Sequence, residues 1–394
     1  MSVTICIHVF PCTTGIERRP TDMKITRIET FCNEFVGFTR ITDETGATGW
    51  GQVSTYHSDI TAQVLHRQIA PWTLGREIDD LDDHLNYIQE REHKFPGSYI
   101  CRAMGGLETA VWDMRGKALG RPVASLLGGS PGKIRAYASS MKRDITPKDE
   151  AERFRRLSGE FGFDAFKFRI GAEVGRGKDE WEGRTEEIIP TIADAFKGQK
   201  VDLMVDANSC YSPMQAIEYG RMLVDNGIGH FEEPCPYWEL EQTRDVTNAL
   251  SDLPIDVTGG EQDCQLPIWK RMIDMRAVDI VQPDVMYMGG IGRTMEVAKL
   301  AAAVGLPVTP HCANLSLVTL FTMHLLRALP NAGKYLEFSI EGADYYPWQQ
   351  NLFVTDPYVI VDGQAEVADA PGWGVEINPE WLAKATYQVS EAAE

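Results

Sequence analysis

Val201-Asp-Leu-Met-Val-Asp206-Ala-Asn208 is a short apolar run that ends on an acid, and two later stretches repeat this pattern. They are His230-Phe-Glu232-Glu233-Pro234 and Val257-Thr-Gly-Gly-Glu261-Gln262. Asp206 and Glu232 are 26 residues apart, and Glu232 and Glu261 are 29 residues apart. Each interval fits one strand, one helix and their loops. The three acids are therefore expected at the carboxyl ends of neighbouring parallel strands.

Outward from these stretches, similar β-rich runs alternate with helical segments, which predicts a parallel sheet. Eight such strands are the number that closes an α/β barrel of the TIM type, and an open doubly wound sheet is the alternative. No G-x-G-x-x-G motif follows an early strand, which weighs against a dinucleotide-binding version of the open sheet. The expected strands are Ile134–Ser140, Ala165–Ile170, Val201–Asp206, His230–Glu233, Ile255–Glu261, Val278–Gln282, Pro307–His311 and Tyr335–Phe338.

The residues before the barrel predict a small α+β domain at 23–130. The sequence from Met23 to Gly51 has the pattern of β-strands. Apolar residues at three- and four-residue steps predict a helix over 102–120 that ends at Gly120. The barrel is expected at 131–343. The segment 344–394 is too short to fold alone and is expected to pack against the first domain, whereas residues 1–22 are expected to be an extension outside the fold.

Composition excludes several classes of protein. The 394 residues carry 38 Lys and Arg against 57 Asp and Glu, a net charge of −19. Such a chain is poorly suited to nucleic acid or to an anionic membrane surface. Eight scattered cysteines without a C-x-x-C pair indicate a reducing, cytoplasmic location, and neither a signal peptide nor a membrane span is expected.

The three strand-end acids predict a metal site. Asp206, Glu232 and Glu261 would repel one another in one barrel mouth unless a cation held them, and hard oxygen ligands select Mg²⁺ or Mn²⁺ over zinc. The alternative is that each acid caps, or lies on the surface of, the helix that follows it.

Basic residues are expected in the same mouth. In Phe166-Lys167-Phe168-Arg169-Ile170 the strand period puts Lys167 and Arg169 on the face opposite the apolar residues. They are either ion-pair partners of the acids or ligands of an anionic substrate. A desolvated Lys167 beside a metal can act as a base, whereas Arg169 stays protonated and suits a carboxylate.

Further polar residues fall at the last three strand ends. Asp284 follows the sixth strand, His311 ends the seventh and Glu337 lies in the eighth. An Asp beside a His fixes the imidazole tautomer and raises its basicity, so His311 is the candidate base. His57 lies in a loop that could reach the mouth.

Taken together, these motifs resemble the enolase superfamily and, within it, the mandelate racemase subgroup. The motifs that carry the resemblance are Thr48-Gly-Trp-Gly-Gln52, Ala110-Val-Trp-Asp-Met-Arg-Gly-Lys117, Leu126-Leu-Gly-Gly129, Lys167-x-Arg169, Asp206-Ala-Asn208, Glu232-Glu-Pro234, Gly260-Glu261, Gln282-Pro-Asp284 and His311.

The resemblance implies a modified (β/α)₇β barrel sealed by an α+β capping domain that the C-terminal segment completes. It implies one Mg²⁺ per subunit on Asp206, Glu232 and Glu261. The remaining site residues that it implies are the Asp284–His311 dyad and Glu337 as a carboxylic acid that hydrogen-bonds an enolate. Asn208, in the Asp206-Ala-Asn208 motif, and His57, in its loop, are expected to bind the substrate. A homo-oligomer is expected on the same ground.

One departure from the family pattern indicates the reaction. The racemase pattern has a second Lys where this chain has Arg169, and racemisation needs a base on each face of the carbanion. We therefore expect one-base chemistry. His311 takes the proton α to a carboxylate and a β-hydroxyl leaves as water, so an aldonate or aldarate gives a 2-keto-3-deoxy acid.

Four alternatives stay open. A racemase or epimerase, or a sugar-lactone cycloisomerase, would use Lys167 with His311. A metal-dependent hydrolase would have mostly His ligands, which are scarce at the strand ends, and a non-catalytic binder of acid sugars would not need a positioned base. The connection from Asn33 to Phe38 is shorter than the family's usual substrate-gating loop, so pentonates, hexonates and hexarates are not distinguished.

Overall fold

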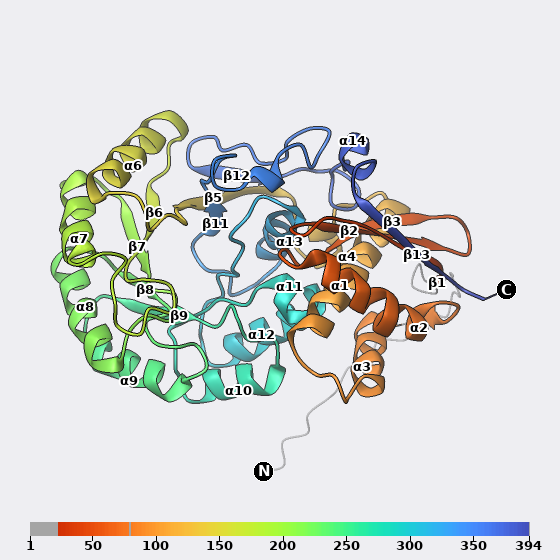
Figure 1. Ribbon diagram of the computed structural model, residues 1–394, viewed down its shortest axis with the longest axis horizontal. Helices are drawn as coiled ribbons and strands as arrows, with labels where there is room; N and C mark the ends of the chain where they lie inside the picture. The colour runs from red at the N-terminus through yellow and green to blue at the C-terminus, as the bar shows by residue number, and fades with distance from the viewer. Residues whose placement is uncertain (1–22, 79, 394) are drawn as a thin grey trace, which may run out of the picture.

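The computed structural model describes residues 23–78 and 80–393. A barrel of parallel strands ringed by helices occupies one side of the molecule, and a second, antiparallel sheet with its own helices packs against it (Figure 1). The expected 1–22 extension lies outside the described residues. No helix in the described part of the chain combines the length and the apolar character needed to cross a bilayer.

The predicted α/β barrel is confirmed. Its strands run in the order β10-β9-β8-β7-β6-β5-β11, and each neighbouring pair is parallel. Their apolar side chains face the surrounding helices in one continuous buried core. The bounds are β5 Gly132–Ser139, β6 Ala165–Arg169, β7 Asp202–Asp206, β8 His230–Glu232, β9 Asp256–Gly259, β10 Ile280–Val281 and β11 Leu336–Ser339.

The seventh expected strand, Pro307–His311, is not a regular strand, which corrects the prediction. Val308 makes isolated parallel bridges to Val281 and Ala332, and His311 makes one to Asp284. Pro307 and Pro310 have no backbone N–H to donate, so a continuous ladder cannot form here. The segment still closes the barrel between β10 and β11.

Helices cover the outside of the barrel. Several begin at good caps: Thr146 accepts from the backbone N–H of Asp149 before α6, and Ser212 and Gln215 form a capping box at α8. The bounds are α6 Pro147–Phe161, α7 Arg184–Ala195, α8 Pro213–Asp225, α9 Leu240–Leu250, α10 Leu266–Asp274, α11 Val285–Met288, α12 Ile291–Ala303 and α13 Leu317–Leu326.

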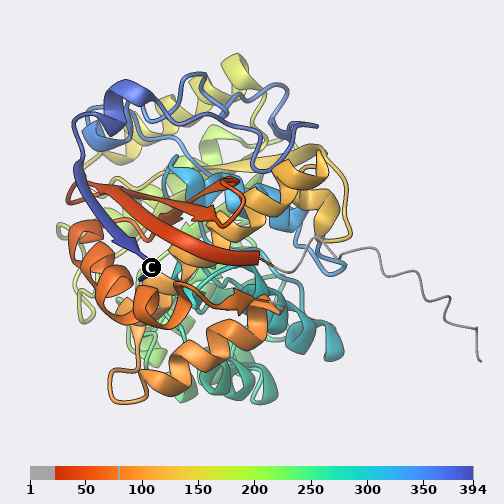
Figure 2. The same cartoon turned by 90° about the vertical axis from the view of Figure 1, so that its right-hand side faces the viewer.

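The cap is an antiparallel sheet in the order β13-β1-β2-β3, with β4 paired to β1 (Figure 2). A tight turn joins β2 and β3, where the Asp43 carboxylate accepts from the backbone of Thr45 and Ala47. The bounds are β1 Met23–Cys32, β2 Gly37–Asp43, β3 Thr48–Val53, β4 Glu77–Ile78 and β13 Thr386–Glu391.

A long central helix, α4 (Ser98–Leu119), packs directly on β3. A Cβ on Gly49 would lie 2.1 Å from the backbone oxygen of Ala110, and one on Gly51 would lie 2.5 Å from its nitrogen. The Gly-Trp-Gly motif is therefore a packing requirement. The helix predicted over 102–120 is confirmed, with an earlier start and with Gly120 in the left-handed region.

The other cap helices surround α4. They are α1 Ser58–Val64, the π-helical η1 Leu65–Ile69, α2 Ala70–Thr73, α3 Leu81–Arg91 and α5 Val123–Leu126. Buried polar contacts tie the cap to the barrel: Gln52 donates to the Ser316 hydroxyl at 2.8 Å and accepts from the backbone of Leu317 at 3.0 Å.

The C-terminal segment divides between the two parts. β13 pairs with β1 in the cap, whereas β12 (Gln364–Val367) pairs antiparallel with β5 of the barrel. The short helix η2 (Pro347–Gln349) precedes β12, and α14 (Pro379–Leu382) lies between β12 and β13. The segment expected to complete the cap thus also extends the barrel sheet.

Candidate active site

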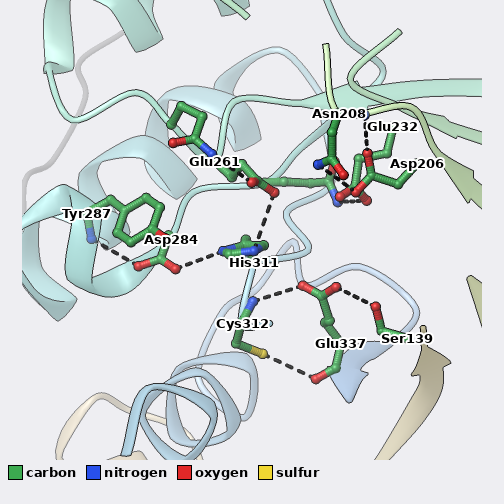
Figure 3. A network of polar contacts seen from close by, with 12 residues as sticks. Ser139, Asp206, Asn208, Glu232, Glu261, Asp284, Tyr287, His311, Cys312 and Glu337 are labelled. Carbon is green, nitrogen blue, oxygen red and sulfur yellow. Dashed lines mark hydrogen bonds and ion pairs between the residues drawn. The ribbon is translucent and has the colours of Figure 1, made fainter. Parts of the chain in front are cut away.

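The strand-end acids lie at one end of the barrel. Asp206 and Glu232 are the last residues of β7 and β8 and pair with each other in the ladder, and Glu261 follows β9 by two residues. All three side chains are buried. Figure 3 shows them in the same close-up as His311.

Lys167 is fully buried between two carboxylates. Its Nζ lies 2.8 Å from Glu232 Oε1 and 2.8 Å from Glu337 Oε1. Burial opposes the charge on Lys167, but Glu232 and Glu337 outweigh it and raise the pKa of the ammonium. In the same way Lys167 overcomes burial and holds the pKa of Glu232 well below its usual range.

Arg169 lies beside Lys167 on the same face of β6. Its Nη1 forms an ion pair with Asp206 Oδ2, its Nε donates to the Ser140 carbonyl at 2.9 Å, and Nη1 also donates to Asn208 Oδ1 at 2.9 Å. Asn208 in turn donates from its backbone to Asp206 Oδ1 at 2.7 Å. The guanidinium is thus fixed at the ends of β6 and β7.

His311 and Asp284 form a hydrogen-bonded pair. Nδ1 of His311 lies 2.8 Å from Asp284 Oδ2, while Asp284 Oδ1 caps α11 by accepting from the backbone of Met286 and Tyr287. The carboxylate is therefore held in place and assigns a proton to Nδ1, which leaves Nε2 as the nitrogen that gains or loses a proton. Nε2 points toward Glu261, 3.5 Å away (Figure 3).

The charges around His311 set its basicity. Burial disfavours the imidazolium, but Glu261 and the hydrogen bond to Asp284 outweigh it and raise the pKa of His311 to about 10. Neutralising Glu261 would remove the largest of these attractions and bring that pKa toward the range of a general base.

The comparisons with known proteins decide the family. Residues 148–381 match the family model described as "Enolase C-terminal domain-like", and residues 6–128 match the N-terminal domain of mandelate racemase and muconate lactonizing enzyme. The chain belongs to this family of the enolase superfamily. It is accordingly an enzyme.

Two curated relatives span most of the chain. An arabinonate dehydratase from Saccharolobus solfataricus is 28% identical over 92% of this chain and 90% of its own length. A D-galactarolactone cycloisomerase from Agrobacterium fabrum is 31% identical over 86% of this chain and 87% of its own.

Solved structures agree on the fold. A proposed racemase from Roseobacter denitrificans is 70% identical, with a TM-score of 0.92 over 94% of this chain and all of its own. A mandelate racemase/muconate lactonizing protein from Paracoccus denitrificans, complexed with magnesium, is 27% identical, with a TM-score of 0.81 over 94% of this chain and all of its own.

The donor set of this family member fits a hard divalent cation. The three acids offer only carboxylate oxygens. A fourth carboxyl group, Glu233, lies beside them, and burial and the charges of Glu261 and Glu232 raise its pKa well above the usual range. Among residues 23–78 and 80–393, no three acidic, His or Cys side chains already point at one metal position. Asp206 and Glu232 instead face Arg169 and Lys167.

Glu337, the expected hydrogen-bond partner of an enolate, lies among hydrogen-bond donors. Its oxygens accept from the Ser139 hydroxyl at 2.8 Å and the Cys312 backbone at 2.9 Å. Burial raises its pKa, but Lys167 and His311 outweigh this and lower the pKa to about 2. With Lys167 in contact, Glu337 is therefore an ionised acceptor. The same contacts favour the ammonium form of Lys167.

Sequence reasoning assigned no role to three further buried side chains. Gln282 donates to Glu232 Oε2 at 2.7 Å, His230 Nε2 lies 3.4 Å from the same oxygen, and Glu233 lies beside Glu261. The Glu-Glu doublet and the Gln-Pro-Asp motif were visible signals for Glu233 and Gln282. His230 sits at the buried start of β8, where the sequence gives no sign of its direction.

His57 does not lie among these buried side chains. It is exposed, with its backbone in the left-handed region at the start of α1. Its neighbour Tyr56 instead packs edge-on against Trp348 at 5.8 Å, and Phe35 stacks on the same indole at 5.9 Å. The short cap loop thus meets the C-terminal segment through aromatic contacts.

Proposed function

We propose that this enzyme removes the proton α to the carboxylate of an acid sugar and then eliminates water, so that an aldonate or aldarate gives a 2-keto-3-deoxy acid. One observation carries the proposal. His311 is oriented as a base by Asp284. The position where the racemase pattern has a second lysine base holds Arg169, which is paired with Asp206.

Each side chain has a defined task. His311 accepts the α-proton at Nε2, because Asp284 keeps the proton of the other nitrogen in place. The resulting imidazolium lies where it can return a proton to the departing β-hydroxyl. Lys167 and Arg169 supply fixed positive charge for the substrate carboxylate, and Glu337 anchors Lys167.

A divalent cation completes the site. One Mg²⁺ per subunit, or Mn²⁺ in its place, would be held by Asp206, Glu232 and Glu261 and would supply the positive charge that an α-carbanion beside a carboxylate requires. The magnesium complex of the structural relative supports this assignment.

A lactone cycloisomerase is the second candidate. Opening a sugar lactone by elimination also begins with removal of a proton next to a carboxyl group, so His311 would serve both reactions. The 31% identity with such an enzyme favours retaining it.

The experiment is a library of aldonates, aldarates and their lactones, incubated with the protein and Mg²⁺ and read out as 2-keto-3-deoxy acid. We expect turnover of an acid sugar that is lost with EDTA and restored by Mg²⁺. Turnover of lactones alone would establish the cycloisomerase, and silence on every compound would refute both candidates.

His311→Asn is expected to lower kcat at least about 10³-fold, because general-base catalysis is removed. The exposed His93→Asn is the control and should keep full activity. Circular dichroism and Mg²⁺ titration should be unchanged in both variants. Near-normal turnover by His311→Asn would contradict the one-base mechanism.

A further inference from the structure

A second arginine lies in the mouth of the barrel. Arg143 follows β5, and its Nε donates to the Gly171 carbonyl at 3.1 Å while its Nη2 donates to Asn208 Oδ1 at 2.5 Å. Gly171 and Asn208 follow β6 and β7, so the guanidinium reaches from the first strand end to the third.

This guanidinium lacks a carboxylate partner. Among residues 23–78 and 80–393, no acidic oxygen lies within 4 Å of it, whereas the adjacent Lys142 pairs with Asp344 at 2.7 Å. Its Nη1 makes no hydrogen bond to these residues and is not sealed from solvent. One edge of the planar fork is therefore open to a ligand.

Two like charges also meet at one oxygen. Asn208 Oδ1 accepts from both Arg143 and Arg169, and only Arg169 has an acid, Asp206, beside it. Burial and the charge of Arg169 lower the pKa of Arg143 to about 10. An anion placed here would relieve this repulsion and gain a bidentate contact.

The position of Arg143 suits the far end of a substrate. Counted around the barrel, β7 is the third strand, and the segment of His311 is the seventh of eight. The Arg143–Asn208 pair therefore lies across the mouth from the base. A sugar acid whose α-carbon lies at His311 would extend its other end toward this pair.

We propose that Arg143 binds the second carboxylate of the substrate, so that the enzyme acts on aldarates in preference to aldonates. This inference rests on the proposed function. A terminal hydroxyl would leave the open fork of Arg143 without an anion. A terminal carboxylate has two oxygens and can accept two hydrogen bonds from the open edge of the Arg143 guanidinium.

The test uses pairs of substrates that differ only at the far carbon, such as galactarate with galactonate and glucarate with gluconate. The native enzyme should favour the aldarate in kcat/KM at least about tenfold. Arg143→Met should reduce kcat/KM for the aldarate about 100-fold and for the aldonate less than about threefold. Arg143→Lys keeps the charge but not the planar guanidinium, so its kcat/KM for the aldarate should lie between those of the native enzyme and of Arg143→Met.

The matched control is Lys142→Met, which removes the neighbouring cation but should leave the aldarate preference unchanged. Equal losses on both substrates with Arg143→Met, or a native preference for aldonates, would overturn the assignment. If no acid sugar is turned over, the proposed function fails. Calorimetric binding of the same pairs to the native protein and to Arg143→Met then decides the role of Arg143 separately.

Discussion

Arg169 is the residue that most directly limits the reaction. Its guanidinium stays protonated at any ordinary pH and is held by Asp206 and the Ser140 carbonyl, so it cannot act as a base on the second face of the substrate. A lysine at the same place would have a shorter reach and a titratable nitrogen.

We therefore expect Arg169→Lys to lower dehydration at least about tenfold and to introduce exchange of the α-proton from the second face. Exchange is measured by NMR in deuterium oxide on unreacted substrate. Unchanged stereochemistry of exchange would show that Arg169 is not what prevents racemase chemistry.

The residue scale also shows what patterns do not predict. The sequence placed Lys167 and Glu337 in one mouth, and the structure puts them 2.8 Å apart. Their protonation follows from that distance, because a buried ammonium and carboxylate in contact stabilise each other's charged forms. No spacing along the chain encodes it.

At the scale of elements, the contact between α4 and β3 is the most demanding one in the cap. Gly49→Ala should destabilise the protein by about 3 kcal/mol or prevent folding, because the new Cβ would meet the Ala110 carbonyl at 2.1 Å and the helix backbone cannot yield. Unfolding in urea measures the loss.

The matched control is Gly159→Ala on the exposed side of α6, where an added Cβ meets nothing within 4 Å. This variant should gain about 0.5–1 kcal/mol from the lower entropy of its unfolded chain and the better helix propensity of alanine. Equal effects of both substitutions would contradict the packing explanation.

Elements were predicted best where the pattern was long. The 22-residue helix α4 and the strands with apolar runs agree with the prediction, whereas the predicted seventh strand, Pro307–His311, is not a regular strand. Its two prolines leave the segment around Val308 with isolated bridges, and tertiary closure of the barrel holds it in place.

At the scale of the whole molecule, the buried His324 makes the stability of the fold depend on pH. His324 is 1% exposed, and its Nδ1 accepts from the backbone of Ala124 at 3.0 Å. Burial lowers its pKa from 6.5 to about 4. Because the folded pKa lies below the unfolded one, its contribution is complete above pH 6.5 and is lost as the pH falls toward 4.

His324→Asn keeps an acceptor near Nδ1 but cannot titrate. We expect it to remove on the order of 3 kcal/mol of the pH dependence of unfolding between pH 6.5 and 4. Urea unfolding at a series of pH values measures this, with exposed His93→Asn as the control. An unchanged slope in His324→Asn would refute the assignment.

The sequence by itself determined the order of the elements, the barrel class and which residues lie at the strand ends, because strand period and β/α spacing are local properties of the chain. The tertiary structure decided which charges touch. It turned Asp206 toward Arg169, placed Glu232 and Glu337 on Lys167, and left one edge of Arg143 open across the mouth. Those contacts join residues from different strands, and their energies depend on burial and distance, which exist only once the barrel has closed.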